Sequence, residues 1–187
     1  NISKVSFIAG RTSKDGKLEP FDPAKDFSKI EQYIKTNPDL KLLMIDPLVS
    51  AISGDMNKAN DVRRSLQPLV DLANKYDFSI FGITHFAKGS VNNNPTDRIL
   101  GSQAFSALAR MAWTAARREA EDDYILVRAK SNISTLDGGI RYHLESVIVE
   151  NTIETTKTTW LGMIEGSAKE LLNTAELSGS ENNSVVD

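Results

Sequence analysis

Cysteine is absent from this sequence, and histidine occurs only twice. Without cysteine the chain can form neither disulfides nor thiolate metal sites, which fits a reducing compartment such as the cytoplasm. Basic residues are not in excess either, since the net charge is −3 at pH 7. Contacts with nucleic acid must therefore come from local basic loops. No apolar run approaches the length of about 20 residues that spans a membrane, so we expect a soluble, cytoplasmic protein with no membrane partner.

The first half of the sequence alternates apolar runs with segments of helical periodicity. We predict strands and helices in the order strand 5–9, helix from Asp22-Pro23 to Asn37-Pro38, strand 40–46, helix at about 58–76 and strand 78–84. Pro68 lies inside the second helix, where an interior proline costs about 3 kcal/mol, so we expect a kink or a break there. The β-α-β-α-β order predicts an α/β fold with a mainly parallel sheet.

The character of the sequence changes after His85. Residues 87–100 (AKGSVNNNPTDRIL) contain glycine, asparagine and proline and are predicted to form a mobile loop. Beyond it we predict a short helix and then an antiparallel extension of the sheet, with elements at 102–109, 110–117, 124–129, 140–144 and 147–149. We assign residues 1–150 to one core domain and 151–187 to a partly disordered carboxyl-terminal extension, because threonine, serine and asparagine dominate there.

Two polar side chains end neighbouring strands of the predicted sheet. Asp46 closes the apolar run 40–46, and His85 follows the run 78–84. In open α/β sheets, ligands bind outside the carboxyl ends of the strands, so both side chains are candidates for one site. An aspartate that closes an apolar strand is typical of a Walker B element. Asp46 would then hold Mg²⁺, through water, beneath the phosphates of a bound nucleotide.

The loop that should accompany such an aspartate is missing. Phosphate binding by a P-loop requires G-x-x-x-x-G-K-[S/T], whose backbone N–H groups and lysine contact the phosphates. The only Gly-Lys pair, Gly16-Lys17, is followed by Leu18, and every Lys-Ser or Lys-Thr pair lacks the preceding glycine. The chain also begins with Asn1 rather than methionine. We interpret it as the carboxyl-terminal part of a larger ATPase, truncated at its amino end and inactive alone.

Four segments together resemble the RecA-like core of the RepA-type hexameric replicative helicases and related plasmid and phage replication ATPases. The segments are LLMIDPLVS at 42–50, GITHFAKGS at 82–90, GSQAFSALAR at 101–110 and RAKSN at 128–132. The resemblance covers about residues 5–145. It implies a three-layer P-loop NTPase core that binds ATP and Mg²⁺, hydrolyses ATP, and assembles with copies of itself into a ring, expected to be a hexamer.

The resemblance also implies roles for individual residues. Asp46 matches the Walker B carboxylate, and His85 matches the sensor that responds to the terminal phosphate. Arg110 matches the arginine finger, which reaches the ATP of the neighbouring subunit. Lys130 falls where related proteins place a second cation that reaches the neighbour's phosphates. These four residues are the predicted catalytic and nucleotide-binding set, whereas the family's Walker A residues and catalytic glutamate have no counterpart here.

The same resemblance places the single-stranded DNA-binding loop at residues 87–100, with Lys88 and Arg98 as its basic residues. Each assignment has a simpler alternative, in which Asp46 caps a turn, His85 is structural and the cations are solvated. Arg117 and Arg118 are expected to be such solvated arginines, paired with nearby acidic residues. Trp113 and Trp160 are expected to be core aromatics rather than platforms for stacking nucleic-acid bases.

The sequence thus predicts part of an ATP-dependent DNA replication ATPase or helicase. One alternative is a RecA-fold ATPase in recombination or regulation without helicase activity. Another is a non-catalytic assembly or binding module that ends a degenerate ATPase.

Overall fold

The computed structural model describes residues 4–8, 10–19, 21–22, 25–86, 94–99, 103–150 and 152–181, with side chains described as far as Ala175. The chain divides into two compact units, Asn1–Thr84 and His85–Asp187, which we describe separately. The helices and strands are β1 Arg11–Thr12, β2 Leu18–Glu19, α1 Phe27–Thr36, β3 Leu42–Ile45, α2 Ala59–Tyr76, β4 Ser79–Gly82, α3 Ala104–Leu108, β5 Met111–Arg118, β6 Asp123–Ser131, β7 Gly139–Val149, β8 Ile153–Ile164 and α4 Ala168–Glu181. In the described part of the chain, no helix combines the length and apolarity that crossing a membrane requires.

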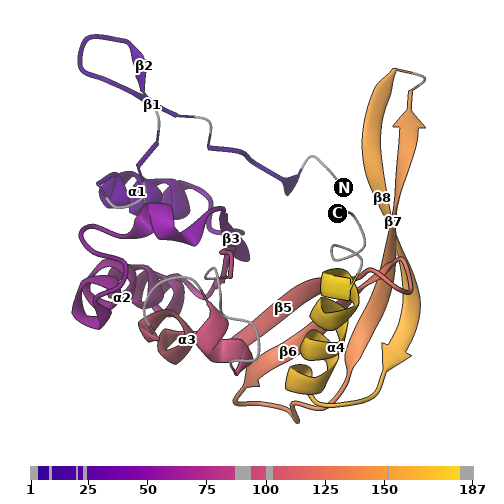
Figure 1. Cartoon of the computed structure of the whole chain (residues 1–187). Coiled ribbons are helices and arrows are strands. Elements are labelled where there is room, and N and C mark those ends of the chain that lie inside the picture. Colours follow the sequence, from indigo (N-terminus) through magenta and orange to yellow (C-terminus); the bar gives the residue numbers. More distant parts are fainter. Residues whose placement is uncertain are drawn as a thin grey trace. The chain divides into compact units, whose positions relative to one another are not determined.

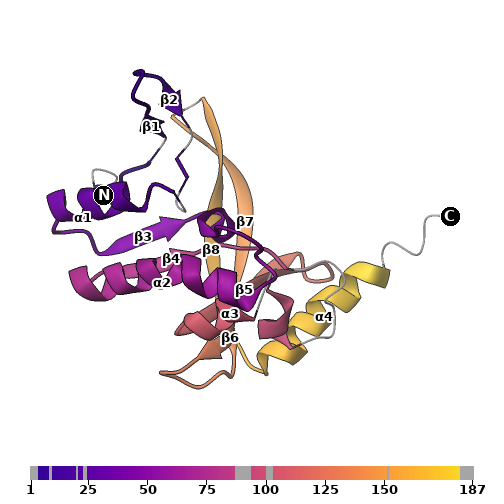
Figure 2. The same cartoon turned by 90° about the vertical axis from the view of Figure 1, so that its left-hand side faces the viewer.

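A parallel pair of strands forms the centre of the first unit. Strands β3 and β4 pair in parallel from Leu42 opposite Ser79 to Ile45 opposite Gly82, and α2 connects them. Figure 2 shows α2 running alongside this pair. The buried side chains of α2 recur at helical spacing, at Val62, Leu66, Leu69 and Leu72. The predicted β-α-β unit at residues 40–84 is therefore confirmed, with shorter strands than the sequence suggested.

Helix α2 continues through Pro68 for 18 residues and does not break there. Proline removes the hydrogen bond that residue 68 would donate to the carbonyl four residues earlier, in Arg64. Arg64 lies on the exposed side of the helix. Burial of the apolar stripe on the other side of the helix then outweighs the loss of one hydrogen bond.

Within the described residues of the first unit, the parallel pair is covered on one face. Ile45 is buried, but Leu42 and Met44, whose side chains point to the other face, are 51% and 56% exposed. Apolar runs of this kind are typical of parallel strands that are buried on both faces, and this strand differs from that pattern in the described structure. The run of apolar letters indicates a strand, but it does not show how many faces of that strand are covered.

The amino-terminal elements differ from the prediction. Residues 5–8 form no strand, Ala9 lies outside the described residues, and the predicted loop contains the β1–β2 hairpin. Helix α1 begins at Phe27, preceded by Asp26, rather than at Pro23, which is outside the described residues. Asp26 is 3% exposed and accepts hydrogen bonds from Arg11 Nη1 and the Asp22 N–H, both at 3.0 Å. These bonds lower the pKa of Asp26, the bond from the Asp22 N–H most strongly.

An antiparallel sheet in the order β5-β6-β7-β8 forms the second unit. Its strands are antiparallel as predicted, but within the described residues it is a sheet of its own and not an extension of the β3–β4 pair. The expected mainly parallel sheet is therefore not seen in the described residues, where β3 and β4 are the parallel pair. Helix α4 packs on β5 and β6 (Figure 1), where Ile125 and Val127 meet Ala168, Leu172 and Ala175. The runs 140–144 and 147–149 belong to one long strand, β7, which pairs with β8 along its length. Gly138, with φ +78°, lies directly before β7, in a backbone conformation that favours glycine.

Residues 151–187, which the sequence analysis assigns to an extension, contain β8 and α4. Strand β8 is exposed over nearly its whole length, and residues 154–159 are all polar, so it has no buried apolar face that would reveal it. Helix α4 does have a start signal, because Ser167 and Glu170 form a capping box. The Ser167 N–H donates to Glu170 Oε2 at 3.0 Å, and the Glu170 N–H donates to Ser167 Oγ at 3.3 Å.

The two tryptophans are not core residues in the described structure. Trp160 is 60% exposed and Trp113 is 40% exposed, so the expectation that they are buried is wrong. On neighbouring strands, Tyr124 stacks on Tyr142 with ring centroids 5.2 Å apart, and Tyr142 packs against Trp160 at 5.6 Å. These rings stabilise the sheet through cross-strand pairs.

Candidate functional site

Asp46 follows the last residue of β3, at the carboxyl end of the parallel pair. On one side of it, the Ile45 carbonyl accepts a hydrogen bond from the Ile83 N–H at 2.9 Å. On the other side, the Leu48 N–H donates to the Ile83 carbonyl at 2.6 Å. The backbone around Asp46 is thus anchored to the segment that leaves β4, while its side chain is exposed. This is the position where open α/β sheets bind ligands.

A single exposed carboxylate suits Mg²⁺ bound together with a nucleotide. Among the residues that the structure describes, no group of three or more histidine, aspartate or glutamate side chains is placed to hold a metal ion. A cage made only of protein ligands is therefore not available in this part of the chain. Mg²⁺ usually keeps several waters and binds one or two carboxylates together with phosphates, which fits the setting of Asp46.

His85 opens the second unit and is exposed. The next residue, Phe86, forms an antiparallel bridge with Ile99, so the chain closes on itself at the base of the predicted DNA-binding loop. Lys88 lies outside the described residues, so its predicted DNA contact stays a prediction.

Arg98 is at the same base of the loop but is not on its surface. It ends a 3₁₀ turn, Pro95–Arg98, and is 2% exposed. Its guanidinium carbon lies 4.1 Å from the centroid of the Phe86 ring, and burial lowers its pKa. A DNA contact through Arg98 stays a prediction, and in the described conformation it would require this segment to open.

Arg110 stands between α3 and β5 with an exposed side chain. Before it, the Ala109 N–H donates to the Phe105 carbonyl at 3.2 Å. After it, the Arg110 carbonyl accepts a hydrogen bond from the Asn132 N–H at 3.3 Å, which links it to the end of β6. The backbone of Arg110 is therefore fixed on both sides, while the guanidinium extends from it.

The ammonium group of Lys130 lies beside the backbone before Arg110 and is already engaged. Lys130 Nζ donates to the carbonyl of Ser106 at 2.6 Å and to that of Ala109 at 2.8 Å. A third carbonyl, of Ala107, lies at 3.4 Å.

The predicted catalytic residues are divided between the two units. Asp46 belongs to the first unit, whereas Arg110 and Lys130 belong to the second.

Of the neighbouring arginines, Arg117 is exposed as expected, whereas Arg118 is buried, so the expectation that Arg118 is solvated is wrong. Arg117 pairs with Glu119 at 3.5 Å and with Asp122 at 3.2 Å. Arg118 is buried and binds both carboxylate oxygens of Asp123, at 2.7 and 2.5 Å, and these bonds raise its pKa. Asp123 was not anticipated as the main partner of Arg118, because only the β5–β6 turn brings the two residues together.

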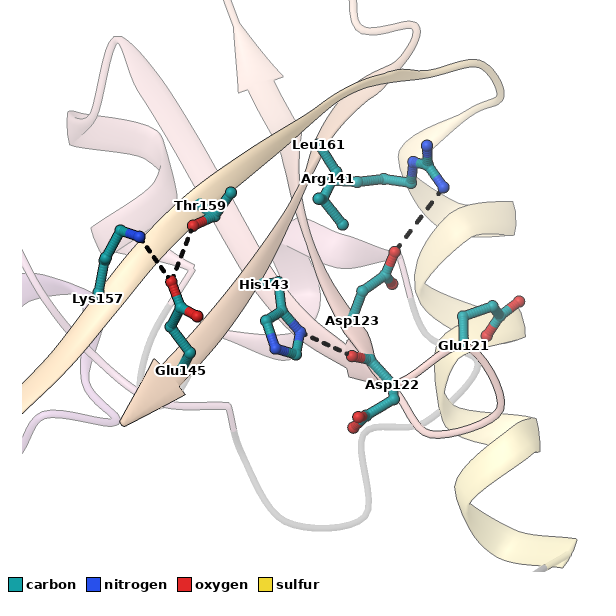
Figure 3. Close-up of a pocket in the computed structure, with 9 residues that line it drawn as sticks. All are labelled: Glu121, Asp122, Asp123, Arg141, His143, Glu145, Lys157, Thr159 and Leu161. Carbon is teal, nitrogen blue, oxygen red and sulfur yellow. Dashed lines mark hydrogen bonds and ion pairs between the residues drawn. The ribbon is translucent and has the colours of Figure 1, made fainter. Parts of the chain in front are cut away.

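A surface depression of about 670 Å³ lies on the sheet of the second unit (Figure 3), and it contains none of the predicted site residues. Its charged side chains have partners either in the depression or beside it, where Arg118 pairs with Glu121 and Arg117 with Asp122. Glu145 accepts from Lys157 at 2.8 Å, and Arg141 lies 3.9 Å from Asp123. The ring of His143 bonds the Asp122 carbonyl through Nδ1 at 3.1 Å. Because its acids and bases are already paired, we assign no chemistry to this depression.

Comparison with known families bears on the first unit. Residues 8–91 match a family model described as an AAA domain. The matched segment contains Asp46 and His85 and ends before Arg110. It supports an AAA-type P-loop ATPase, with nucleotide binding and ATPase activity in general terms. A search of curated proteins found no match.

Proposed function

We propose that this chain is the Walker B and arginine-finger part of a RecA-like ATPase that acts on DNA in replication, in the manner of the RepA-type helicases. The observation that carries the proposal is the position of Asp46. It is an exposed carboxylate at the carboxyl end of a parallel β-α-β unit, inside the segment that matches an AAA domain. The wider sequence resemblance over residues 5–145 supports the replication role.

In this proposal water attacks the terminal phosphorus of ATP, the bond from that phosphorus to the bridging oxygen breaks, and ADP and inorganic phosphate are the products. Mg²⁺ bound with ATP would neutralise charge at the phosphates, and Asp46 is the residue that would hold it. His85, three residues beyond β4, responds to the terminal phosphate. Arg110 extends to the nucleotide of the neighbouring subunit and stabilises the negative charge of the transition state.

In this proposal, two parts of each site come from outside one copy of the chain: the phosphate-binding loop and Arg110 of a neighbouring subunit. No segment of the sequence has the G-x-x-x-x-G-K-[S/T] pattern, so the phosphate-binding loop must be contributed by another segment. The arginine finger acts on a neighbouring subunit, so the proposed assembly is a ring, and a hexamer by resemblance. Single-stranded DNA is its proposed partner, contacted through the loop whose base the Phe86–Ile99 bridge closes.

Asp46→Asn in the ATPase that contains this chain tests the proposal. The substitution keeps the shape of the side chain but removes the charge that orients Mg²⁺, so we expect the turnover of ATP to fall by orders of magnitude. Asp71→Asn is the control, because Asp71 is an exposed carboxylate on α2 that accepts a hydrogen bond from Gln67. Circular dichroism checks that both variants fold. Near-normal turnover of Asp46→Asn would make Asp46 a turn residue and remove the basis of the proposal.

A further inference from the structure

Lys130 satisfies the carbonyl end of helix α3. The last four carbonyls of a helix have no partner inside it, and the helix dipole places partial negative charge there. Two of these carbonyls, in Ser106 and Ala109, accept hydrogen bonds from Lys130 Nζ, and the carbonyl of Ala107 is 3.4 Å away. An ammonium group has three N–H donors, so this set of acceptors can use its full capacity.

The end of β6 and the residue that follows it bond the backbone on both sides of Arg110. Lys130 bonds the carbonyl of Ala109, directly before Arg110, and the Asn132 N–H bonds the carbonyl of Arg110 itself. The register of the sheet places Lys130 opposite Ala112, two residues after Arg110. The side chain of Arg110 therefore extends from a point where hydrogen bonds from one lysine and one backbone amide connect α3, β5 and β6.

A lysine in this position is poorly suited to reach a neighbour's phosphates. Moving Nζ toward another subunit would break two short hydrogen bonds and leave the end of α3 without its cation. Arg110 differs, since no hydrogen bond or ion pair engages its side chain within the described residues. Of the two cations, Arg110 is free to act on a ligand, and Lys130 is not.

We propose that Lys130 is a positioning residue for Arg110 and not a second cation that contacts the phosphates. This inference rests on the proposed function of Arg110 as an arginine finger. Lys130 fixes the end of α3 and with it the direction in which Arg110 extends. A misplacement of about 1 Å in a catalytic group can cost about 100-fold in rate, so such a positioning role has a measurable effect.

The first test uses amide hydrogen exchange on the full 187-residue chain and does not depend on ATPase activity. In Lys130→Met we expect faster exchange at the Ala109 and Asn132 amides, whose acceptors lie in the segment that Lys130 holds. Lys130→Arg keeps several donors and should retain most of the protection. Lys157→Met is the control, because Lys157 belongs to the same sheet but pairs with Glu145. Unchanged exchange in Lys130→Met would overturn the positioning role.

The second test is a double-mutant cycle on ATP turnover in the ATPase that contains this chain. We expect Lys130→Met to lower kcat by about 10- to 100-fold with little change in KM for ATP. In the Arg110→Ala background the same substitution should cost no more than about twofold, because its effect passes through Arg110. Lys130→Arg should recover most of the turnover. If Lys130→Met does not fold, Lys130→Arg replaces it in the double-mutant cycle.

The outcomes separate the two proposals. If the losses in kcat from the Lys130 and Arg110 substitutions multiply, or if KM for ATP rises, Lys130 is an independent phosphate contact. That result would overturn the positioning role and leave the proposed ATPase function standing. Normal turnover of Arg110→Ala would instead refute the arginine finger, and with it a positioning role in catalysis. The exchange experiment would then still show whether Lys130 holds the end of α3.

Discussion

Removal of the Arg110 guanidinium should abolish turnover without abolishing the binding of ATP. The side chain is exposed and extends from a backbone that is hydrogen-bonded on both sides, so Arg110→Ala should leave that backbone in place. Arginine fingers contribute about 10³–10⁵ in rate, which corresponds to about 4–7 kcal/mol of transition-state stabilisation. We therefore expect a loss of that size in kcat in the ATPase that contains this chain. Arg117→Ala is the matched control, because Arg117 is exposed but pairs with Glu119 and Asp122.

A mixing experiment tests whether Arg110 acts on a neighbouring subunit. Subunits with Arg110→Ala but an intact phosphate-binding loop are combined with subunits that carry Arg110 but have an inactive loop. Neither set turns over ATP alone. Interfaces that join a good loop to a neighbour's good arginine should restore part of the turnover.

Native mass spectrometry shows whether mixed rings have formed. Mixed rings that stay inactive would argue against action between subunits. Normal turnover by rings made only of Arg110→Ala subunits would refute the role of Arg110 altogether and leave it a solvated charge at the start of β5.

Two further predictions concern stability. Leu172→Ala removes a fully buried side chain of α4 that packs with Ile125 and Val127. It should lower the free energy of unfolding of the second unit by about 2–5 kcal/mol, measured by urea unfolding. An unchanged urea midpoint would mean that α4 is not docked on the sheet. Glu31 on α1 has its pKa lowered from 4.5 to about 2 by Lys75 and Tyr76 of α2 and by Lys35. The stability that the charged Glu31 contributes is therefore present above about pH 4.5 and is lost as the pH falls toward 2, so urea midpoints of Glu31→Gln should vary less across this range than those of the parent chain.

The sequence predicts elements well where apolar periodicity is strong. The β3–α2–β4 unit follows from two apolar runs around a helical stripe, and the antiparallel arrangement after residue 110 follows from short runs and turns. It does not predict β8, because that strand is stabilised by backbone pairing with β7 rather than by an apolar face of its own. It also misplaces the start of α1, since Asp26 accepts a hydrogen bond from Arg11, 15 residues away, and that contact is not readable from local sequence.

The candidate site shows the same division. That Asp46 ends a strand is readable from the letters, because the apolar run stops there. That Arg98 is buried against Phe86 is not readable, since a basic residue in a polar loop gives no sign of a tertiary contact. The sequence likewise marks Lys130 as a charge near the end of a strand, and only the fold reveals the carbonyls of α3 around its ammonium group.

The polar residues of the site fall into two classes: those with exposed side chains that make no hydrogen bond or ion pair within the described residues, and those whose side chains are already bonded. A side chain that acts on a bound nucleotide must keep its polar atoms available in the absence of that nucleotide. Within the described residues, Asp46, His85 and Arg110 meet this condition, because each is exposed and none has its side chain in a hydrogen bond or ion pair.

Lys130 and Arg118 fail the same condition for a physical reason. Each is held by acceptors within its own unit, carbonyls for Lys130 and the Asp123 carboxylate for Arg118, so each would lose hydrogen bonds before it could make new ones. These hydrogen bonds hold β5 and β6 in place. The two strands follow Arg110 in the sequence and support it. The available side chains are therefore the ones to test for chemistry, and the engaged cations are the ones to test for positioning.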